Sequence, residues 1–254
     1  MLIEQTLDKM NAMKLFGMAD AFKQQLGSSE AAKLGFDERV GLLTDSEWTT
    51  REQRKLKRRL RAAKLRYAAS LEDVDFKHPR QLDRQQVLSL GTCSFIQNHN
   101  NLIITGPTGI GKSYLVCAFV ERACRRGYAA GYVRLPRLLQ QLAVARGDGS
   151  YARILDRLAR FDLLAIDDWL LAPLRDSERR DLVEVVEDRS ERASTLIASQ
   201  LSTEDWHASI GDPNLADSIC DRLLQSAHRI KLKGPSMRDR EPKPAPNNSS
   251  KQRS

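Results

Sequence analysis

Eight residues, "GPTGIGKS" from Gly106 to Ser113, have the types and spacing of a loop that binds nucleotide phosphates. Glycines in such a loop let backbone N–H groups turn towards the β- and γ-phosphates. Lys112 would place a positive charge there, and the Ser113 hydroxyl would hold Mg²⁺. A glycine-rich turn can match by chance, but here the apolar run "NLIIT" precedes the loop and an amphipathic stretch follows it. We therefore expect ATP and Mg²⁺ to bind, with the nucleotide on Gly106, Pro107, Thr108, Gly109, Ile110, Gly111, Lys112, Ser113 and Tyr114.

A second candidate for chemistry is the pair Asp167-Asp168, which directly follows the apolar run "LLAI". A carboxylate at the tip of a buried strand beside a phosphate loop can orient Mg²⁺, so the expected metal residues are Ser113 and Asp167. Asp168 would then polarise the attacking water. The alternative is that the two aspartates only begin a turn, as aspartates often do.

The elements that must position these residues follow from the pattern after residue 101, where strands alternate with helices. This order predicts a three-layer α/β core with a parallel sheet, the architecture of a P-loop NTPase, in which ligands lie at the carboxyl ends of the strands. A helix is expected after Asp176 or Ser177 as its N-cap. The expected strands are "NLIIT", "AAGYVRL", "LLAI", "TLIAS" and "HRIKL".

A strongly basic run, "REQRKLKRRLRAAKLR", occupies residues 51–66 with nine basic residues and one acidic residue. Thr49 and Glu52 have the spacing of a capping box, and the apolar stripe through Leu56, Leu60, Ala63 and Tyr67 predicts a helix. We expect its cationic face to contact DNA phosphates without reading the bases. The alternative is an ordinary solvated face. The expected contacts are Arg54, Lys55, Arg58 and Arg61.

These patterns divide the chain. Residues 1–68 are expected to form a small all-α N-terminal domain that carries the basic helix, residues 69–84 a linker, and residues 85–238 the ATPase domain. Residues 239–254 are expected to be a disordered tail, because they are rich in Pro, Ser, Asn and Lys. The apolar positions expected to face inwards in the first domain are Leu7, Met10, Leu15, Met18, Phe22 and Leu26.

Composition excludes some other classes of protein. The net charge of +8 favours a polyanionic partner, and the longest apolar runs are too short to cross a bilayer. The acidic N-terminus does not resemble an export signal, so we expect a cytoplasmic protein. Four cysteines without a C-x-x-C pair predict reduced thiols and no metal cluster.

At this point the sequence resembles a known family. The segments "NLIITGPTGIGKSYL", "FDLLAIDDW", "TLIASQLSTEDWH" and "SICDRLLQSAHRIKLKGPSMRD", in this order, look like the IstB-like ATPases. That family comprises helper proteins encoded beside a transposase in bacterial insertion sequences. It is related to the helicase loader DnaC and belongs to the AAA+ initiator clade. The resemblance covers nearly the whole chain.

The resemblance implies roles for particular residues. Asp167 would be the Walker B carboxylate, with Asp168 where related proteins commonly have Glu. Ser199 or Gln200 would be a polar sensor, and Arg222 an arginine finger that completes the site of a neighbouring subunit, unless it is an ordinary surface arginine. Two helices between "AAGYVRL" and "LLAI" would line a DNA path, with Arg134, Arg137 and Arg146 as candidate phosphate contacts. No room is left for a helical lid, so Arg238 is the candidate for a second sensor.

The resulting expectation is an ATPase that assembles as a ring or filament on duplex DNA, largely independently of sequence, and recruits a partner transposase. One alternative is a DnaC-like helicase loader acting on single-stranded DNA. A second is a small-molecule phosphotransferase, which is disfavoured because no acceptor site is evident in the sequence.

Overall fold

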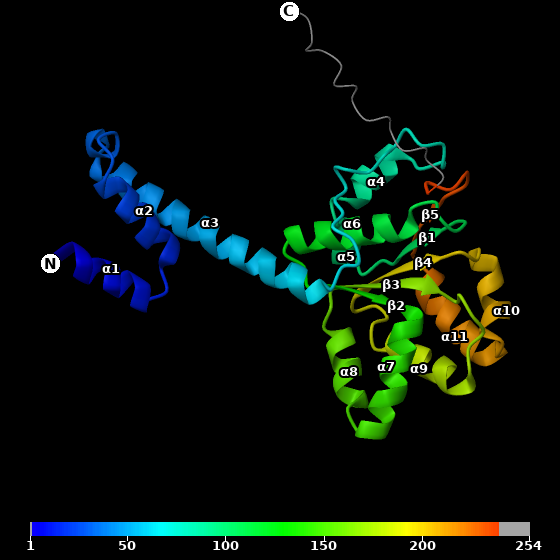
Figure 1. Cartoon of the computed structure of the whole chain (residues 1–254). Coiled ribbons are helices and arrows are strands. Elements are labelled where there is room, and N and C mark those ends of the chain that lie inside the picture. Colours follow the sequence, from blue (N-terminus) through cyan, green and yellow to red (C-terminus); the bar gives the residue numbers. More distant parts are fainter. Residues whose placement is uncertain (1, 239–254) are drawn as a thin grey trace, which may run out of the picture. The chain divides into compact units, whose positions relative to one another are not determined.

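The computed structural model of the chain describes residues 2–238 (Figure 1). The chain divides into two compact units, Met1–Ala62 and Ala63–Ser254, which we call the N-terminal unit and the C-terminal unit. Residues 63–68, expected to belong to the first domain, therefore group with the second. The tail expected at residues 239–254 lies outside the described residues.

The N-terminal unit is helical. It comprises α1 (Leu2–Ala12), α2 (Phe16–Leu26), a 3-10 turn η1 (Ala31–Lys33) and the long helix α3 (Phe36–Ala63), which ends one residue inside the C-terminal unit. Lys14 adopts a positive φ of 60° at the break between α1 and α2. Six apolar positions were expected to face inwards. The prediction is wrong for Leu26, which is 46% exposed, whereas the other five are half-buried.

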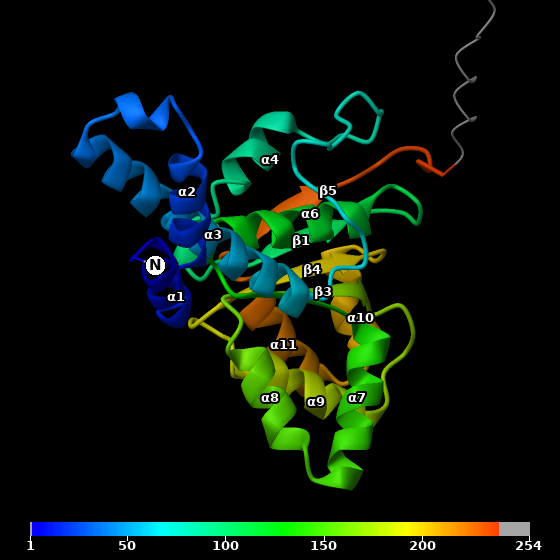
Figure 2. The same cartoon turned by 60° about the vertical axis from the view of Figure 1, so that its left-hand side comes forward.

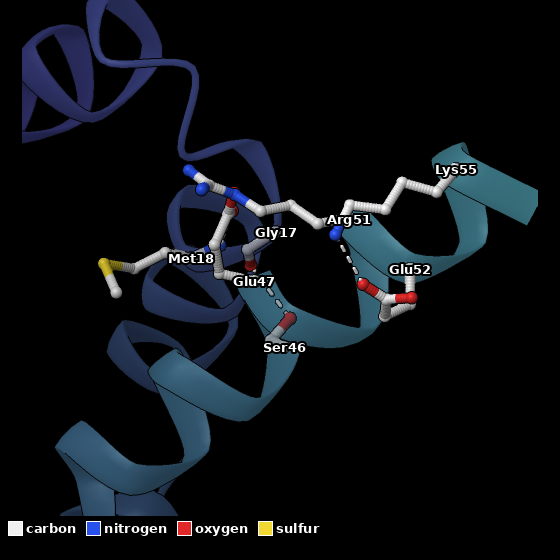
Figure 3. Close-up of polar contacts among 7 residues, drawn as sticks. All are labelled: Gly17, Met18, Ser46, Glu47, Arg51, Glu52 and Lys55. Atoms are coloured by element: carbon white, nitrogen blue, oxygen red, sulfur yellow. Dashed lines mark hydrogen bonds and ion pairs between the residues drawn. The ribbon is translucent and has the colours of Figure 1, made fainter. Parts of the chain in front are cut away.

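Helix α2 packs closely on α3 around Gly17 (Figure 3). A Cβ on Gly17 would collide with the backbone of Ser46 and the side chain of Thr50 in α3, so glycine permits this approach. The Ser46 hydroxyl donates to the Gly17 carbonyl at 2.9 Å. The Glu47 carboxylate, 6% exposed, accepts from the Met18 amide at 3.1 Å and from Arg51 Nε at 2.7 Å. A buried carboxylate thus joins the start of α2 to the middle of α3.

The basic run lies in the second half of α3, but the capping box expected at Thr49 and Glu52 is wrong. The helix begins at Phe36, where the Glu38 carboxylate accepts from the Gly35 amide at 2.9 Å, and it continues through Thr49 without a break. It ends at Ala63, and Lys64 follows with a φ of 53°. Because the helix stops there, Tyr67 does not continue the apolar stripe.

The C-terminal unit is built on one parallel sheet with the strand order β2-β3-β4-β1-β5. The strands are β1 (Leu102–Thr105), β2 (Ala130–Arg134), β3 (Leu163–Trp169), β4 (Ser194–Ser199) and β5 (His228–Lys231). The central strands β1 and β4 are buried along their whole length, as expected for apolar runs covered on both faces. The predicted three-layer α/β core is confirmed.

Helices cover both faces of this sheet (Figures 1 and 2). One face carries α6 (Lys112–Arg125), and the other carries α7 (Leu135–Asp148), α9 (Asp176–Glu187) and α11 (Pro213–Leu224). The core on this second face joins Ile166 and Ile197 of the strands to Leu142 of α7, Leu182 of α9 and Ile219 of α11. The remaining helices are α4 (Arg84–Leu90), α5 (Ser94–Gln97), α8 (Tyr151–Ala159) and α10 (Trp206–Ile210), with a 3-10 turn η2 (Thr203–Asp205).

Two details of the C-terminal unit differ from the sequence-based expectation. Helix α9 has Arg175 at its N-cap, instead of Asp176 or Ser177, with the Glu178 carboxylate accepting from the Arg175 amide at 2.7 Å. The segment 69–84 is not a free linker, because Leu71, Val74 and Arg80 are buried in the unit. Over residues 2–238, no helix is both long and apolar enough to span a bilayer.

The contacts of Glu47 generate a prediction for the N-terminal unit. Burial raises the pKa of Glu47, but hydrogen bonds from Arg51, Met18 and Gly17 outweigh it and lower the pKa below its ordinary value. A carboxylate with a lowered pKa stabilises the folded state above its unfolded pKa, and this stabilisation is lost as the pH falls through the folded pKa. We expect Glu47→Gln to destabilise this unit at neutral pH by on the order of 1 kcal/mol, and to have no effect at strongly acidic pH.

Fluorine NMR of fluorotryptophan can measure this in the full chain during urea unfolding, because Trp48 is the only tryptophan before residue 63. Glu52→Gln is the matched control, since Glu52 forms an exposed pair with Lys55 on the same helix at 2.8 Å. Equal behaviour of the two variants at neutral pH would contradict the role assigned to Glu47.

Candidate functional site

A cavity of about 430 Å³ lies at the carboxyl end of the sheet. It brings together the phosphate loop, the tandem aspartates and the segment after β4. It also receives two segments outside the sheet, one before α4 and one after β5. Its lining residues are Arg66, Tyr67, Asp73, Asp75, Arg80, Thr108, Gly109, Gly111, Lys112, Ser113, Tyr114, Asp167, Asp168, Ala198, Gln200, Met237 and Arg238.

Strand register explains why these residues meet. Thr105, the last residue of β1, pairs with Ser199, the last residue of β4, and Trp169 of β3 also pairs with Ser199. The chain leaves β1 into Gly106, whose amide donates to the Ser199 carbonyl at 3.2 Å. Since parallel strands end at the same edge, the loop after β1 and the carboxylates of β3 lie on that edge together.

The phosphate loop has the backbone that its glycines predict. Gly109 and Gly111 adopt φ values of 84° and 96°, and Gly111 is the N-cap of α6. Helix α6 therefore points its free N–H groups and its partial positive charge at the cavity. Lys112 is buried, and its Nζ donates to the carbonyls of Gly106 at 2.7 Å and Pro107 at 2.9 Å. Burial lowers the pKa of Lys112, while Asp167 and Asp168 act in the opposite direction.

Asp167 is fixed on both of its oxygens. Tyr132 of β2 donates its hydroxyl to Oδ2 at 2.8 Å, and the Asp168 amide donates to Oδ1 at 2.9 Å. Burial, with the adjacent Asp167, raises the pKa of Tyr132, so this hydroxyl remains a donor. The oxygen donors of Asp167 and Ser113 are of the kind that Mg²⁺ prefers, and the two side chains share the cavity with the phosphate loop. The donor set therefore fits an ATP-bound Mg²⁺.

Asp168 lies in a β-bulge. The register of β3 and β4 shifts between Ile166 and Trp169, and Asp168 adopts a φ of 56°. A bulge re-aims a side chain relative to the alternation of the strand. Here the carboxylate turns to Arg134, whose Nε donates to it at 2.5 Å. Arg134 is the N-cap residue of α7, so this ion pair joins the cavity to the helix that follows β2.

The structure separates the two sensor candidates. Ser199 is fully buried, its hydroxyl donates to the Trp169 carbonyl at 3.1 Å, and it accepts from the Leu201 amide. It does not line the cavity. Gln200 does, and its Oε1 accepts from the Thr108 hydroxyl of the phosphate loop at 2.7 Å.

The two helices expected between β2 and β3 are α7 and α8, but their arginines are not equally available. Arg134 pairs with Asp168, and Arg146 pairs with Asp181 of α9 and stacks on Tyr151. Arg137 is exposed and has no ion pair within residues 2–238. Arg146 is thus better described as an anchor of α7 on α9 than as a phosphate contact.

Helix α8 and its C-cap residue Arg160 carry a basic stripe that was not predicted from the sequence. Arg153, Arg157 and Arg160 follow one another at i, i+4 and i+7, all are exposed, and none has an ion pair in the described chain. This spacing places them on one face. The signal was present in the sequence, but it was hidden because two acidic residues, Asp156 and Asp162, keep the local net charge low.

The basic half of α3 also holds some of its charges in local contacts. The Arg54 guanidinium lies 4.5 Å from the centre of the Phe16 ring, and Lys55 pairs with Glu52. Arg58 and Arg61 are exposed and make no ion pair in the described part of the chain. Of the four expected contacts, these two are available to a polyanion.

Arg222 lies away from the phosphate loop of its own chain. Its carbonyl accepts from the side chain of Asn101, the residue that precedes β1, whereas the phosphate loop follows β1. Its guanidinium donates to Glu187 at 2.6 Å and to the Ser218 hydroxyl at 2.7 Å. The structure therefore places Arg222 at the amino end of the sheet, lining a different cavity.

Several residues in the nucleotide cavity, or in contact with its two aspartates, were not predicted to lie there. Tyr132 and Arg134 are two apart in β2 and therefore point to the same face, but this becomes meaningful only when β2 is known to lie beside β3. Arg66, Tyr67 and Arg80 come from segments that were assigned to the N-terminal domain and the linker. Only Arg238 among the outlying residues was expected near the site, and it does line the cavity.

The strand order, the phosphate loop after β1 and the carboxylates at the end of β3 together define a P-loop NTPase of the AAA+ type. Among the described residues no helix follows β5. The chain belongs to the IstB-like ATP binding protein family, whose model matches residues 8–245. The expected resemblance is confirmed.

The relatives agree with this family assignment, and solved structures agree with the fold. The chain is 49% identical to an insertion sequence ATP-binding protein of Sinorhizobium fredii, over 94% of this chain and 97% of that protein. It is 45% identical to the ATP-binding protein of insertion sequence IS1162 of Pseudomonas fluorescens, over 79% and 87%. In fold it is similar to DnaI, with a TM-score of 0.57, 20% identity and coverage of 69% and 93%. It is also similar to the DnaC helicase loader, with a TM-score of 0.55, 20% identity and coverage of 67% and 100%.

The geometry of Lys112 generates a prediction for ATP binding. Lys112→Ala removes the buried positive charge at the loop, and we expect the Kd for MgATP to rise by about a hundredfold or more, because hydrogen bonds to charged groups contribute about 1.5–3 kcal/mol each. Isothermal titration calorimetry measures this. Lys231→Ala is the control, since Lys231 is an exposed lysine of β5 outside the cavity. If Lys112→Ala bound MgATP with unchanged affinity, the cavity would not be the nucleotide site.

Proposed function

We propose that this protein hydrolyses ATP and uses bound ATP to assemble head to tail on duplex DNA, where the assembly recruits a transposase. The role in transposition is supported by membership of the IstB-like family and by relatives named for insertion sequences. DnaA, a structural neighbour at 17% identity, is known bound to the nucleotide analogue AMPPCP, which supports a nucleotide in the equivalent cavity.

Within the cavity, each residue has a proposed task. Backbone N–H groups of the loop and Lys112 bind the β- and γ-phosphates, and Ser113 and Asp167 hold Mg²⁺, which neutralises charge on the phosphates when bound. Asp168 orients and polarises the attacking water. We assign the sensor role to Gln200 in place of Ser199, because Gln200 reaches the phosphate loop whereas the Ser199 hydroxyl is bonded to Trp169 and Leu201.

The observation that carries the assembly proposal is the position of Arg222. It lies beyond the amino end of β1, and its own phosphate loop lies beyond the carboxyl end of the same strand. Four strand residues span about 13 Å at about 3.3 Å each, too far for Arg222 to reach its own nucleotide. An arginine that stabilises charge on the transferred phosphoryl group must therefore act on the site of a neighbouring protomer.

The ion pair between Arg222 and Glu187 must break before Arg222 can act on a neighbour. In the single chain Arg222 donates to Glu187 at 2.6 Å. To act as a finger, the guanidinium must exchange this carboxylate for a phosphate oxygen of the neighbour. The phosphate carries more negative charge and offers more acceptor oxygens, so the exchange is favoured only when a triphosphate is bound next door. ATP thereby promotes assembly, and its hydrolysis weakens the contact.

The DNA part of the proposal is supported by two basic faces, one on each unit. Arg58 and Arg61 lie on α3, and the α8 stripe comprises Arg153, Arg157 and Arg160. Exposed arginines without carboxylate partners bind a phosphate backbone by releasing counterions, without sequence preference. Arg134 and Arg137 at the start of α7 are further candidates, and a phosphate that drew Arg134 away would free Asp168.

A DnaC-like helicase loader is the alternative. The likeness to DnaC and DnaI supports the fold but not the substrate. The family and the insertion sequence relatives favour the transposition role. Binding to duplex DNA in preference to single strands separates the two.

A charge-reversal experiment tests the DNA faces. We expect Arg58→Glu with Arg61→Glu, and separately Arg153→Glu with Arg157→Glu, to weaken binding to long duplexes of any sequence. The slope of log K against log salt should flatten by about 0.9 for each DNA phosphate that the variant no longer neutralises. Fluorescence anisotropy over a salt series gives both quantities.

The matched control reverses Lys9 and Lys23, two exposed lysines of α1 and α2, which changes the net charge by the same amount. If the control loses as much affinity as the arginine variants, total charge alone attracts DNA. The two faces would then not be the binding surface.

A mixing experiment tests the action of Arg222 on a neighbour. Arg222→Ala keeps an intact phosphate loop, and Lys112→Ala keeps an intact arginine. We expect each alone to lack ATP turnover with duplex DNA present. Their mixture should recover part of it, because the second protein supplies its arginine to the nucleotide of the first. Turnover is measured against mixing ratio at constant total protein.

Two controls make the mixing result decisive. Circular dichroism establishes that both variants are folded, and light scattering establishes that they co-assemble. Background turnover at every ratio, with both controls satisfied, would contradict the assignment of Arg222 as a finger.

A further inference from the structure

Arg80 is a fully buried arginine, 2% exposed, in the segment that precedes α4. A buried guanidinium costs free energy unless its donors find acceptors. Its Nη2 donates to the Asp75 carbonyl at 3.0 Å in the same segment. Its Nη1 donates to the Ile110 carbonyl of the phosphate loop at 2.9 Å and lies 3.0 Å from Met237 Sδ after β5. One side chain thus joins three separate segments of the C-terminal unit.

Backbone contacts complete this arrangement. The Lys233 amide donates to the Arg80 carbonyl at 3.1 Å, and the Met237 amide donates to the Gly109 carbonyl at 3.0 Å. We call residues 233–238 the C-terminal strap. The strap and Arg80 therefore hold two successive carbonyls of the phosphate loop, those of Gly109 and Ile110.

These contacts on the carbonyls also orient the amide group that follows each carbonyl. In a trans peptide unit the C=O and the following N–H point in opposite directions. When Arg80 binds the Ile110 carbonyl, the Gly111 N–H points away from Arg80. When the Met237 amide holds the Gly109 carbonyl, the Ile110 N–H is turned in the same way. These are N–H groups of the kind that surround nucleotide phosphates.

The fit around Arg80 also explains a requirement for glycine that is independent of phosphate. A Cβ on Gly111 would collide with the Arg80 guanidinium, and one on Gly109 would collide with the Ser236 side chain of the strap. Both glycines have positive φ. The close approach of Arg80 and the strap therefore constrains the same two glycines that the phosphate loop needs.

We propose that Arg80 is a positioning residue which, together with the C-terminal strap, sets the phosphate loop in its nucleotide-binding conformation before a triphosphate binds. The proposal rests on the nucleotide site of the proposed function, but not on DNA binding or assembly. A loop that is already ordered loses less conformational entropy on binding, so Arg80 acts on affinity for the phosphates. The turnover of bound ATP depends on Asp167 and Asp168, which Arg80 does not contact through any of these hydrogen bonds.

The test compares Arg80→Gln with Arg189→Gln in the full chain. Arg189 is equally buried, but it donates to the carbonyls of Leu158, Phe161 and Ser194, all outside the nucleotide cavity. Both substitutions remove a buried guanidinium and should lower thermal stability. We expect only Arg80→Gln to raise the Kd for MgATP in calorimetry, by about ten- to a hundredfold, the effect of losing a charged hydrogen bond.

Hydrogen exchange adds a local measurement. Without nucleotide, the amides of residues 109–112 should exchange faster in Arg80→Gln than in the parent, and saturating MgATP should restore their protection. Unchanged affinity in folded Arg80→Gln would overturn the proposal, and so would an equal loss of affinity in Arg189→Gln. If the parent itself fails to bind MgATP, the proposed function fails first, so the two failures are distinguishable.

A second pair of variants covers the case in which Arg80→Gln does not fold. Met237→Pro removes the amide that donates to the Gly109 carbonyl, whereas Met237→Leu keeps it. A Kd raised by about tenfold in the proline variant alone supports the proposal, since removal of one hydrogen bond has about this effect. Equal affinity of the two variants overturns it.

Discussion

The parallel register of β1, β4 and β3 is the constraint on which the rest of the site depends. It brings the ends of three strands to one edge, where Thr105 and Trp169 both pair with Ser199. Each functional group then follows from where its strand stops: the phosphate loop after β1, the two aspartates at the end of β3, and Gln200 after β4. The register also accounts for Ser199 itself, which holds the strand ends together instead of facing the nucleotide.

Arginine has three different tasks in this chain, which its net charge of +8 does not reveal. Arg80 and Arg189 are buried and bind backbone carbonyls. Arg134 and Arg222 pair with carboxylates, at Asp168 and Glu187. Arginines of the third group are exposed on α3 and α8 and make no ion pair in residues 2–238. The proposed DNA contacts are drawn mainly from this third group, on two helices.

The two arginines that pair with carboxylates, Arg134 and Arg222, offer a way for one chain to respond to both ATP and DNA, the ligands of the proposed function. Arg134 joins Asp168 to the start of α7, and Arg222 joins α11 to Glu187 of α9. A phosphate, whether of DNA or of a neighbour's nucleotide, competes with a carboxylate for each guanidinium. Coupling between sites then follows from the exchange of one anion for another, which requires two alternative partners but no large movement of the sheet.

The sequence by itself determined the elements with strong local signals. Apolar runs fixed the five strands, the glycine spacing fixed the phosphate loop, and the concentration of Arg and Lys placed a basic face on a helix. It misplaced the start of α3, because a capping pattern at Thr49 is indistinguishable locally from the middle of a longer helix. Tertiary structure alone decided which polar groups meet. The contacts of Arg80 with Ile110 and Met237 link residues far apart in the chain, and their pairing depends on packing and strand order, which no local pattern encodes.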